Sequence, residues 1–147
     1  MSAYPVLMHT ALDATDCRGL AEFYRQFLGL RYRPGDEMPA DGSDDDADWL
    51  VLLDPAGHRV LAFAEVPALA RPTWPAHEVP KQMHHDFRLP NIEELRRQRQ
   101  RAEELGATLL YDRSDDGGEP FRPAADTPSS DGPRDGARYC VSAQGPG

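Results

Sequence analysis

The sequence predicts an α+β fold in which one unit, a strand followed by a helix and then further strands, occurs twice. Each copy carries a histidine seven positions before a residue that can cap a helix: His9 precedes Asp16, and His84 precedes Asn91. The two helical stretches also end alike, at Leu28-Gly29 and at Leu105-Gly106. A repeat of this kind fixes the architecture, because both copies are expected to adopt one supersecondary structure.

The first copy begins with a strand over residues 5–13, which has a more apolar face and an opposite face that includes His9 and Asp13. Asp16 is the expected N-cap of the helix that follows. Apolar residues recur at helical spacing from Leu20 to Leu28, and Gly29 suits a left-handed helix end. Cys17 follows the cap, where the helix dipole can lower the pKa of a thiol, but a structural cysteine is the favoured interpretation.

The rest of the first copy alternates between strands and loops. Residues 30–33 form a short predicted strand, and the acidic residues 36–48 form a loop. A compact buried strand, Trp49–Leu53, is followed by the turn Asp54–Gly57 and a strand over Arg59–Val66. Residues 67–80 contain four prolines, which lack a backbone donor, and are expected to form an extended crossover.

The second copy repeats these signals more weakly. Its strands are predicted at Gln82–Leu89, Thr108–Tyr111, near Glu119–Ala125 and at Arg138–Ser142, with the helix after Asn91. The strand near Glu119–Ala125 is poor, because residues 112–136 are rich in Asp, Gly, Pro and Ser. We therefore expect a single domain over residues 1–147, with one module at about 5–66, the crossover 67–80 and a second module at about 81–144.

Composition excludes several classes of function. The net charge of −9 repels phosphate backbones, so a nucleic-acid partner is not expected. Two cysteines do not make a disulfide scaffold. No secretion signal or membrane-spanning apolar run is recognised, which together with the cysteine content favours the cytoplasm.

Strand alternation indicates where a site would lie. The more apolar faces of residues 5–13 and of Gln82–Leu89 are expected beneath the helices. The opposite faces carry His9 and Asp13 in the first copy and His84, Asp86 and Arg88 in the second. If the two copies curl together, these side chains line one cleft. The alternative is that each histidine only hydrogen-bonds a neighbour.

Several motifs, in this order and spacing, resemble the vicinal oxygen chelate superfamily, which includes glyoxalase I, bleomycin-resistance proteins and extradiol dioxygenases. They are His9-Thr10 before Asp16, Phe23-Tyr24 with Leu28-Gly29, the turn Asp54-Pro55-Ala56-Gly57, and His84 before the second helix. The resemblance covers most of residues 5–111. It implies two tandem βαβββ modules that form a curled mixed sheet around a cleft, and members often form homodimers.

In metal-dependent members of that superfamily, ligands come from the first and fourth strands of each module. His9 and His84 match the first-strand positions. The internal repeat places Leu61 and Cys140 at the fourth-strand positions, where the second module usually has a glutamate. Glu65 lies on the same strand face as Leu61 and could substitute. Two imidazoles and a carboxylate, His9, His84 and Glu65, suit Fe(II), Ni(II) or Zn(II).

Two functions follow as expectations. The first is a metal-free small-molecule-binding protein that sequesters an apolar or aromatic compound, with a ligand pocket of His9, Leu61, Phe63, Trp74, His84 and Cys140. The alternative is a metal-dependent lyase, isomerase or dioxygenase in which Glu65 or Asp86 acts as a general base. Trp74 is the best ligand-facing aromatic, whereas Trp49 and Tyr24 are interpreted as core or loop anchors. A degenerate cleft is the third reading.

Overall fold

The computed structural model describes residues 4–74, 76–110 and 137–141, the last five by their backbone alone. The chain divides between Arg71 and Pro72 into two compact units. This division falls inside the predicted crossover. Among the described residues, no helix is both long and apolar enough to cross a membrane.

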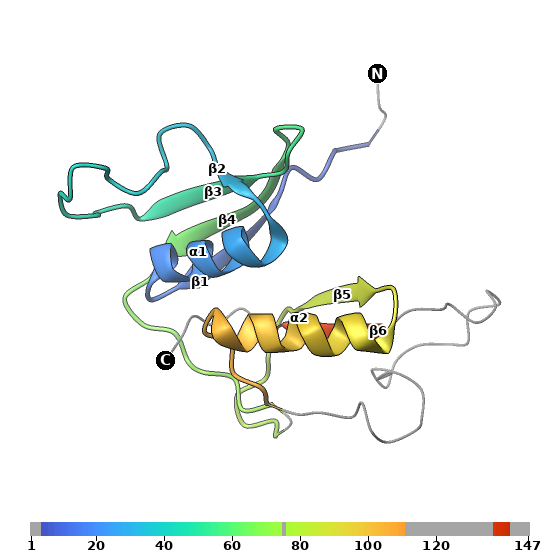
Figure 1. The fold of residues 1–147 in the computed structure, drawn as a ribbon. Helices are drawn as coiled ribbons and strands as arrows, with labels where there is room; N and C mark the ends of the chain where they lie inside the picture. The colour runs from blue at the N-terminus through green and yellow to red at the C-terminus, as the bar shows by residue number, and fades with distance from the viewer. Residues whose placement is uncertain (1–3, 75, 111–136, 142–147) are drawn as a thin grey trace. The chain divides into compact units, whose positions relative to one another are not determined.

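The first unit has the βαβββ order expected for the first module. It contains β1 (Thr10–Ala14), α1 (Cys17–Leu28), β2 (Arg31–Tyr32), β3 (Trp49–Leu53) and β4 (Arg59–Glu65). The strands form one mixed sheet in the order β1-β4-β3-β2, with β1 parallel to β4 and the other pairs antiparallel (Figure 1). The sheet is open, with β1 and β2 at its edges, so the predicted curled sheet is corrected to a four-stranded open sheet.

The ends of α1 are those that the sequence predicts. The backbone N–H of Gly19 donates to Oδ1 of Asp16 over 2.8 Å, so this carboxylate caps the helix. Gly29 ends the helix with φ at 67°, a conformation that costs glycine little because it has no Cβ. Both predictions are confirmed. The helix therefore begins and ends at fixed points beside the sheet.

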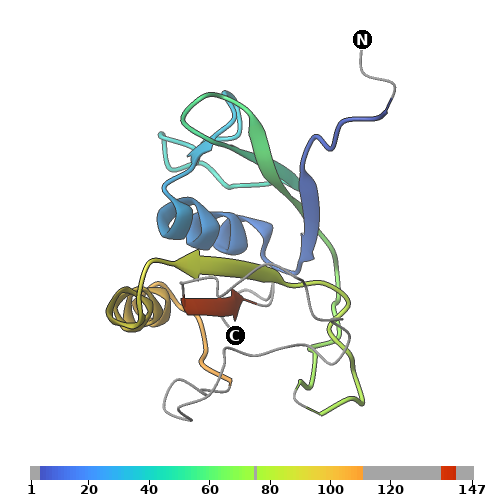
Figure 2. The same ribbon diagram turned by 90° about the vertical axis from the view of Figure 1, so that its right-hand side faces the viewer.

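One side of the sheet and α1 form the core of the first unit. The rings of Tyr24 and Phe63 lie 5.8 Å apart, and both side chains are fully buried. By strand register, Leu12 of β1 and Leu50 of β3 stand level with Phe63 and share its side of the sheet. Figure 2 shows α1 along one side of the strands, and the contact between Tyr24 and Phe63 identifies this as the side that carries Phe63. Burial of these side chains supplies most of the driving force for the fold.

The opposite side of the sheet, here termed the distal face, has a different character. Residues one position along from the core-facing ones lie on it, since successive strand side chains alternate. Its members, by register, are Ala11, Asp13, Trp49, Val51, Leu53, Ala62 and Ala64. Val51, Leu53 and Ala62 form a buried apolar cluster, whereas Ala11, Asp13 and Trp49 are exposed.

The second unit contains β5 (His85–Leu89), α2 (Ile92–Glu104) and β6 (Ala137–Val141). Oδ1 of Asn91 accepts from the N–H of Glu94 over 2.8 Å, which confirms the predicted cap. β5 and β6 form an antiparallel pair, beside which α2 is viewed almost along its axis in Figure 2. Half-buried and exposed side chains alternate along β5, as its sequence pattern predicts.

Four predictions about the strands are either corrected by the structure or concern residues outside the described ranges. β1 begins at Thr10 and not at residue 5, and Val6 and Leu7 are more than 80% exposed because no strand pairs with them. Residues 108–110 form no strand, although one was predicted over Thr108–Tyr111. The predicted strand near Glu119–Ala125 lies outside the described residues. β6 runs antiparallel to β5, whereas its expected counterpart β4 runs parallel to β1.

Candidate functional site

An aromatic pair stands on the distal face. The imidazole of His9 and the indole of Trp49 meet edge to face, with ring centroids 6.1 Å apart and planes inclined by 62°. His9 immediately precedes β1 and Trp49 begins β3, and β4 lies between these strands. The pair therefore bridges β4, whose residues on this face include the small side chains of Ala62 and Ala64. Two alanines leave the volume that the rings need.

Each ring has a part that could contact a ligand. Trp49 is 39% exposed although it lies beside a buried cluster, so part of its indole surface is open to a ligand. Nδ1 of His9 is buried and has no hydrogen-bond partner among the described residues. A buried polar atom without a partner costs free energy that a ligand or a water molecule can recover. The pair thus offers an apolar surface beside one unsatisfied polar atom.

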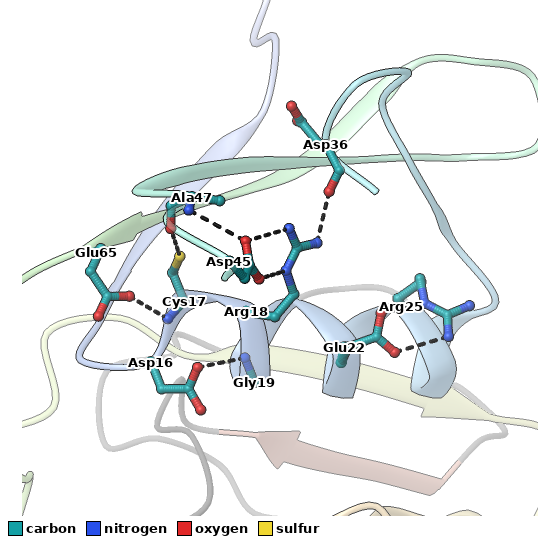
Figure 3. Close-up of polar contacts among 10 residues, drawn as sticks. All are labelled: Asp16, Cys17, Arg18, Gly19, Glu22, Arg25, Asp36, Asp45, Ala47 and Glu65. Carbon is teal, nitrogen blue, oxygen red and sulfur yellow. Dashed lines mark hydrogen bonds and ion pairs between the residues drawn. The ribbon is translucent and has the colours of Figure 1, made fainter. Parts of the chain in front are cut away.

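The segment before Trp49 is fastened to the first turn of α1 (Figure 3). The guanidinium of Arg18 binds both carboxylate oxygens of Asp45 and donates to the carbonyl of Asp36 over 2.7 Å. The same guanidinium lies 4.8 Å from the centroid of the Tyr32 ring. This two-pronged ion pair holds the acidic loop in one place and holds the pKa of Asp45 below its usual value.

Cys17 and Glu65 make the remaining attachments. Oε2 of Glu65 accepts from the N–H of Cys17 over 2.7 Å, and the N–H of Glu65 donates to the carbonyl of Asp48 over 2.8 Å. The thiol of Cys17 donates to the carbonyl of Ala47 over 3.1 Å. Burial, reinforced by Glu65, raises the pKa of this thiol to about 12. Cys17 is therefore a structural hydrogen-bond donor and not an activated nucleophile.

An acidic cavity of about 280 Å³ lies at this junction. Its carboxylates come from the helix cap, the acidic loop and the end of β4: Asp16, Asp45, Asp46, Asp48 and Glu65. Arg18 and the Cys17 backbone already occupy Asp45 and Glu65. Within the part of the chain that the structure describes, no group of three or more His, Cys, Asp or Glu side chains is placed to hold a metal ion.

The predicted metal ligands of the first unit are placed apart. Glu65 pairs with Ala14, on the α1 side of the sheet, and its carboxylate binds the helix start. His9 meets Trp49 on the distal face. The sheet separates the two groups, so this half of the predicted ligand set does not fit a metal. His84 belongs to the second unit, and its pairing with His9 stays a prediction.

The predicted pocket residues Leu61 and Phe63 occupy the core. They are 4% and 0% exposed and share the α1 side of β4. The structure thus places them across the sheet from His9 and not beside it. Their packing against α1 holds β4 in position, and the opposite side of β4 carries Ala62 and Ala64.

The remaining predicted residues lie in the second unit. The ring of Trp74 is half-buried, and the ammonium of Lys81 lies 4.5 Å from its centroid, a cation–π contact. Nε2 of His84 lies 3.6 Å from Oδ1 of the exposed Asp86, too long for a strong hydrogen bond. Asp86 pairs with Cys140 in the β5–β6 ladder.

Sequence reasoning interpreted Trp49 as a core or loop anchor and so missed its place beside His9. The strand Trp49–Leu53 reads as a continuous apolar run, and such a run does not show which end is exposed. The available signal was its position. Trp49 directly follows the acidic loop, where a strand leaves the polar surface.

Comparison with known proteins gives one match. A family model described as a glyoxalase-like domain matches residues 9–141, which is most of the chain. The curated proteins and the solved structures give no match.

Proposed function

The chain belongs to the glyoxalase-like domain family, and on that premise we propose that it binds a small apolar or aromatic compound without a metal, on the distal face of the first unit. Trp49 supplies a stacking surface, and His9 supplies a hydrogen bond. The observation that carries this proposal is the buried, unpartnered Nδ1 of His9 next to a Trp49 ring that is 39% exposed.

The physical argument is one of incomplete burial. Binding sites for small molecules combine apolar and aromatic walls with a few fixed polar groups. Ring stacking adds favourable interaction beyond the area that it buries. The attachments of Arg18, Cys17 and Glu65 hold the chain that leads to Trp49, so less conformational entropy is lost when a ligand binds.

Equilibrium dialysis with quinoline, a neutral two-ring compound with one acceptor nitrogen, tests the proposal. We expect Trp49→Ala to weaken binding by about tenfold or more. Trp74→Ala is the matched control, because it removes an indole of the second unit, and should leave binding unchanged. His9→Phe keeps a ring and removes Nδ1, so a smaller loss is expected. Equal losses for Trp49→Ala and Trp74→Ala would reject the proposed site.

The metal-dependent lyase, isomerase or dioxygenase remains the alternative, and no reaction step is derived for it. Its test is elemental analysis of protein that has been incubated with Fe(II), Ni(II) or Zn(II) and then desalted. Stoichiometric metal that is lost in His9→Ala and in His84→Ala would favour it over the binding protein. Retention of metal in both variants would remove these histidines as ligands.

We also propose that the second half completes a cleft as a second module, and that the protein forms a homodimer. The family resemblance supports both statements. Light scattering of the purified chain gives its mass directly, and a monomer at all concentrations would remove the dimer.

A further inference from the structure

We infer that the distal face selects a cationic planar compound over neutral and anionic ones, with Asp13 as the residue that sets this preference. The inference rests on the proposed function, because it names the class of ligand that the same site takes. Its basis is the placement of a carboxylate beside the aromatic pair.

Register places Asp13 and Trp49 on either side of one small residue. Asp13 pairs with Ala64 across β1 and β4, and Ala64 pairs with Trp49 across β4 and β3. Neighbouring strands are separated by about 4.8 Å, so the backbones of Asp13 and Trp49 stand about 10 Å apart on one face. A two-ring compound has about this dimension. It can lie over Ala64 with one end near the carboxylate and its ring on the indole.

The two groups favour the same ligand charge. The face of an indole attracts cations more strongly than any other aromatic side chain does. A carboxylate at the other end adds Coulomb attraction, and Asp13 is exposed and therefore accessible. The chain as a whole carries a net charge of −9, which raises the local concentration of cations.

The basic groups around this end of the face oppose the inference only weakly. Asp48, which directly precedes Trp49 and is exposed, favours a cation in the same way as Asp13. Two arginines share the distal face by register, Arg31 and Arg59, and both pair with Leu53 at the far end of β3, four residues from Trp49. That separation is about 13 Å, beyond the screening length at ordinary salt. His9 is the closest group that can carry a positive charge.

Calorimetric titration of the full chain with three two-ring probes tests the inference: quinoline, 1-methylquinolinium and 1-naphthoate. At about pH 8, where imidazoles are mostly uncharged, we expect the cation to bind about tenfold more tightly than quinoline and the anion to bind most weakly. Asp13→Asn should reduce the cation to the affinity of quinoline without changing quinoline itself. Asp44→Asn, which removes the same charge from the acidic loop, should keep the preference. The preference should shrink as salt is raised.

The outcomes separate this inference from the proposed function. Equal affinity for cation and quinoline, or tighter binding of 1-naphthoate, overturns the cation preference. If quinoline then still binds and loses affinity in Trp49→Ala, the proposed function stands alone. A preference that survives Asp13→Asn removes Asp13 as its source. Failure of all three probes to bind overturns both.

Discussion

The helices of the two units have similar sequence motifs at their N-termini but bury different numbers of side chains. Asp16 and Asn91 cap their helices through the same side-chain contact, at 2.8 Å in each. Yet α1 buries six of its side chains, whereas α2 buries only Ala102. The difference follows from the partner sheet. α1 packs on strands of a four-stranded sheet, and α2 lies beside a described pair of strands. The cap determines where a helix begins, whereas packing against the rest of the protein determines how stable that helix is.

The strand connections differ as well. β1 and β4 run parallel, and α1 packs on one side of the mixed sheet that these strands share with β3 and β2. β5 and β6 run antiparallel. The repeat in the sequence therefore extends to the strand and the capped helix, and not to the pairing of the described strands. A local pattern can be duplicated while long-range pairing is not, because pairing depends on every strand between the two partners.

The largest expected effect is on the core of the first unit. Phe63→Ala removes a fully buried ring and should lower the free energy of unfolding by about 3–5 kcal/mol. Phe87→Ala removes the same ring from the half-buried strand β5 and should cost about half as much. Urea unfolding of both variants measures the difference. Equal costs would show that the two units are equally well packed.

The second effect concerns the attachment of the acidic loop. Arg18→Lys keeps the charge but loses the two-pronged contact with Asp45 and the contact with Tyr32, at a cost of about 1–2 kcal/mol. Arg25→Lys is the matched control on the same helix. Arg25 pairs with Glu22 one turn away on a partly exposed surface, so less than about 0.5 kcal/mol is expected. The reverse ranking would mean that the loop is not held by Arg18.

The helix caps should respond alike, since their geometry is shared. Asp16→Ala and Asn91→Ala should each cost about 1 kcal/mol locally. Hydrogen exchange of the first-turn amides reads each helix separately. A loss confined to α1 would sharpen the contrast between the units, because it would show that α2 does not depend on its cap.

The smallest expected effect is a pH dependence of opposite sign in the two units. Burial raises the pKa of Cys17 from 9.0 to about 12. A thiol that ionises more easily in the unfolded chain contributes its full stability below pH 9.0 and loses it as the pH rises toward about 12. In the second unit, burial lowers the pKa of His85. That contribution is present above the ordinary imidazole pKa and is lost as the pH falls.

Two substitutions test this contrast by thermal unfolding over a pH series. Cys17→Ser removes the ionising thiol and should flatten the alkaline limb, although Tyr32 still contributes because burial raises its pKa to about 12. His85→Gln should flatten the acidic limb. If Cys17→Ser leaves the alkaline slope unchanged, the thiol is not the group that titrates there.

Sequence reasoning found the parts of the fold that local chemistry determines. The cap at Asp16, the end at Gly29 and the strand Trp49–Leu53 are all present. The pocket assignments of Leu61 and Phe63 came from the internal repeat, the family resemblance and aromatic character, none of which shows which face of β4 the helix covers. Only the register of β4 against β1 decides that, and register is set by contacts distant in sequence. For the same reason sequence reasoning could not bring Trp49 to His9.

The central claim is that the first unit binds aromatic compounds on its distal face. Nuclear magnetic resonance of the indole N–H groups tests it most directly, because the chain has two tryptophans, one in each unit. Addition of quinoline is expected to shift the Trp49 signal and to leave that of Trp74 in place. A shift of Trp74 alone, or of neither signal at saturating quinoline, would contradict the claim.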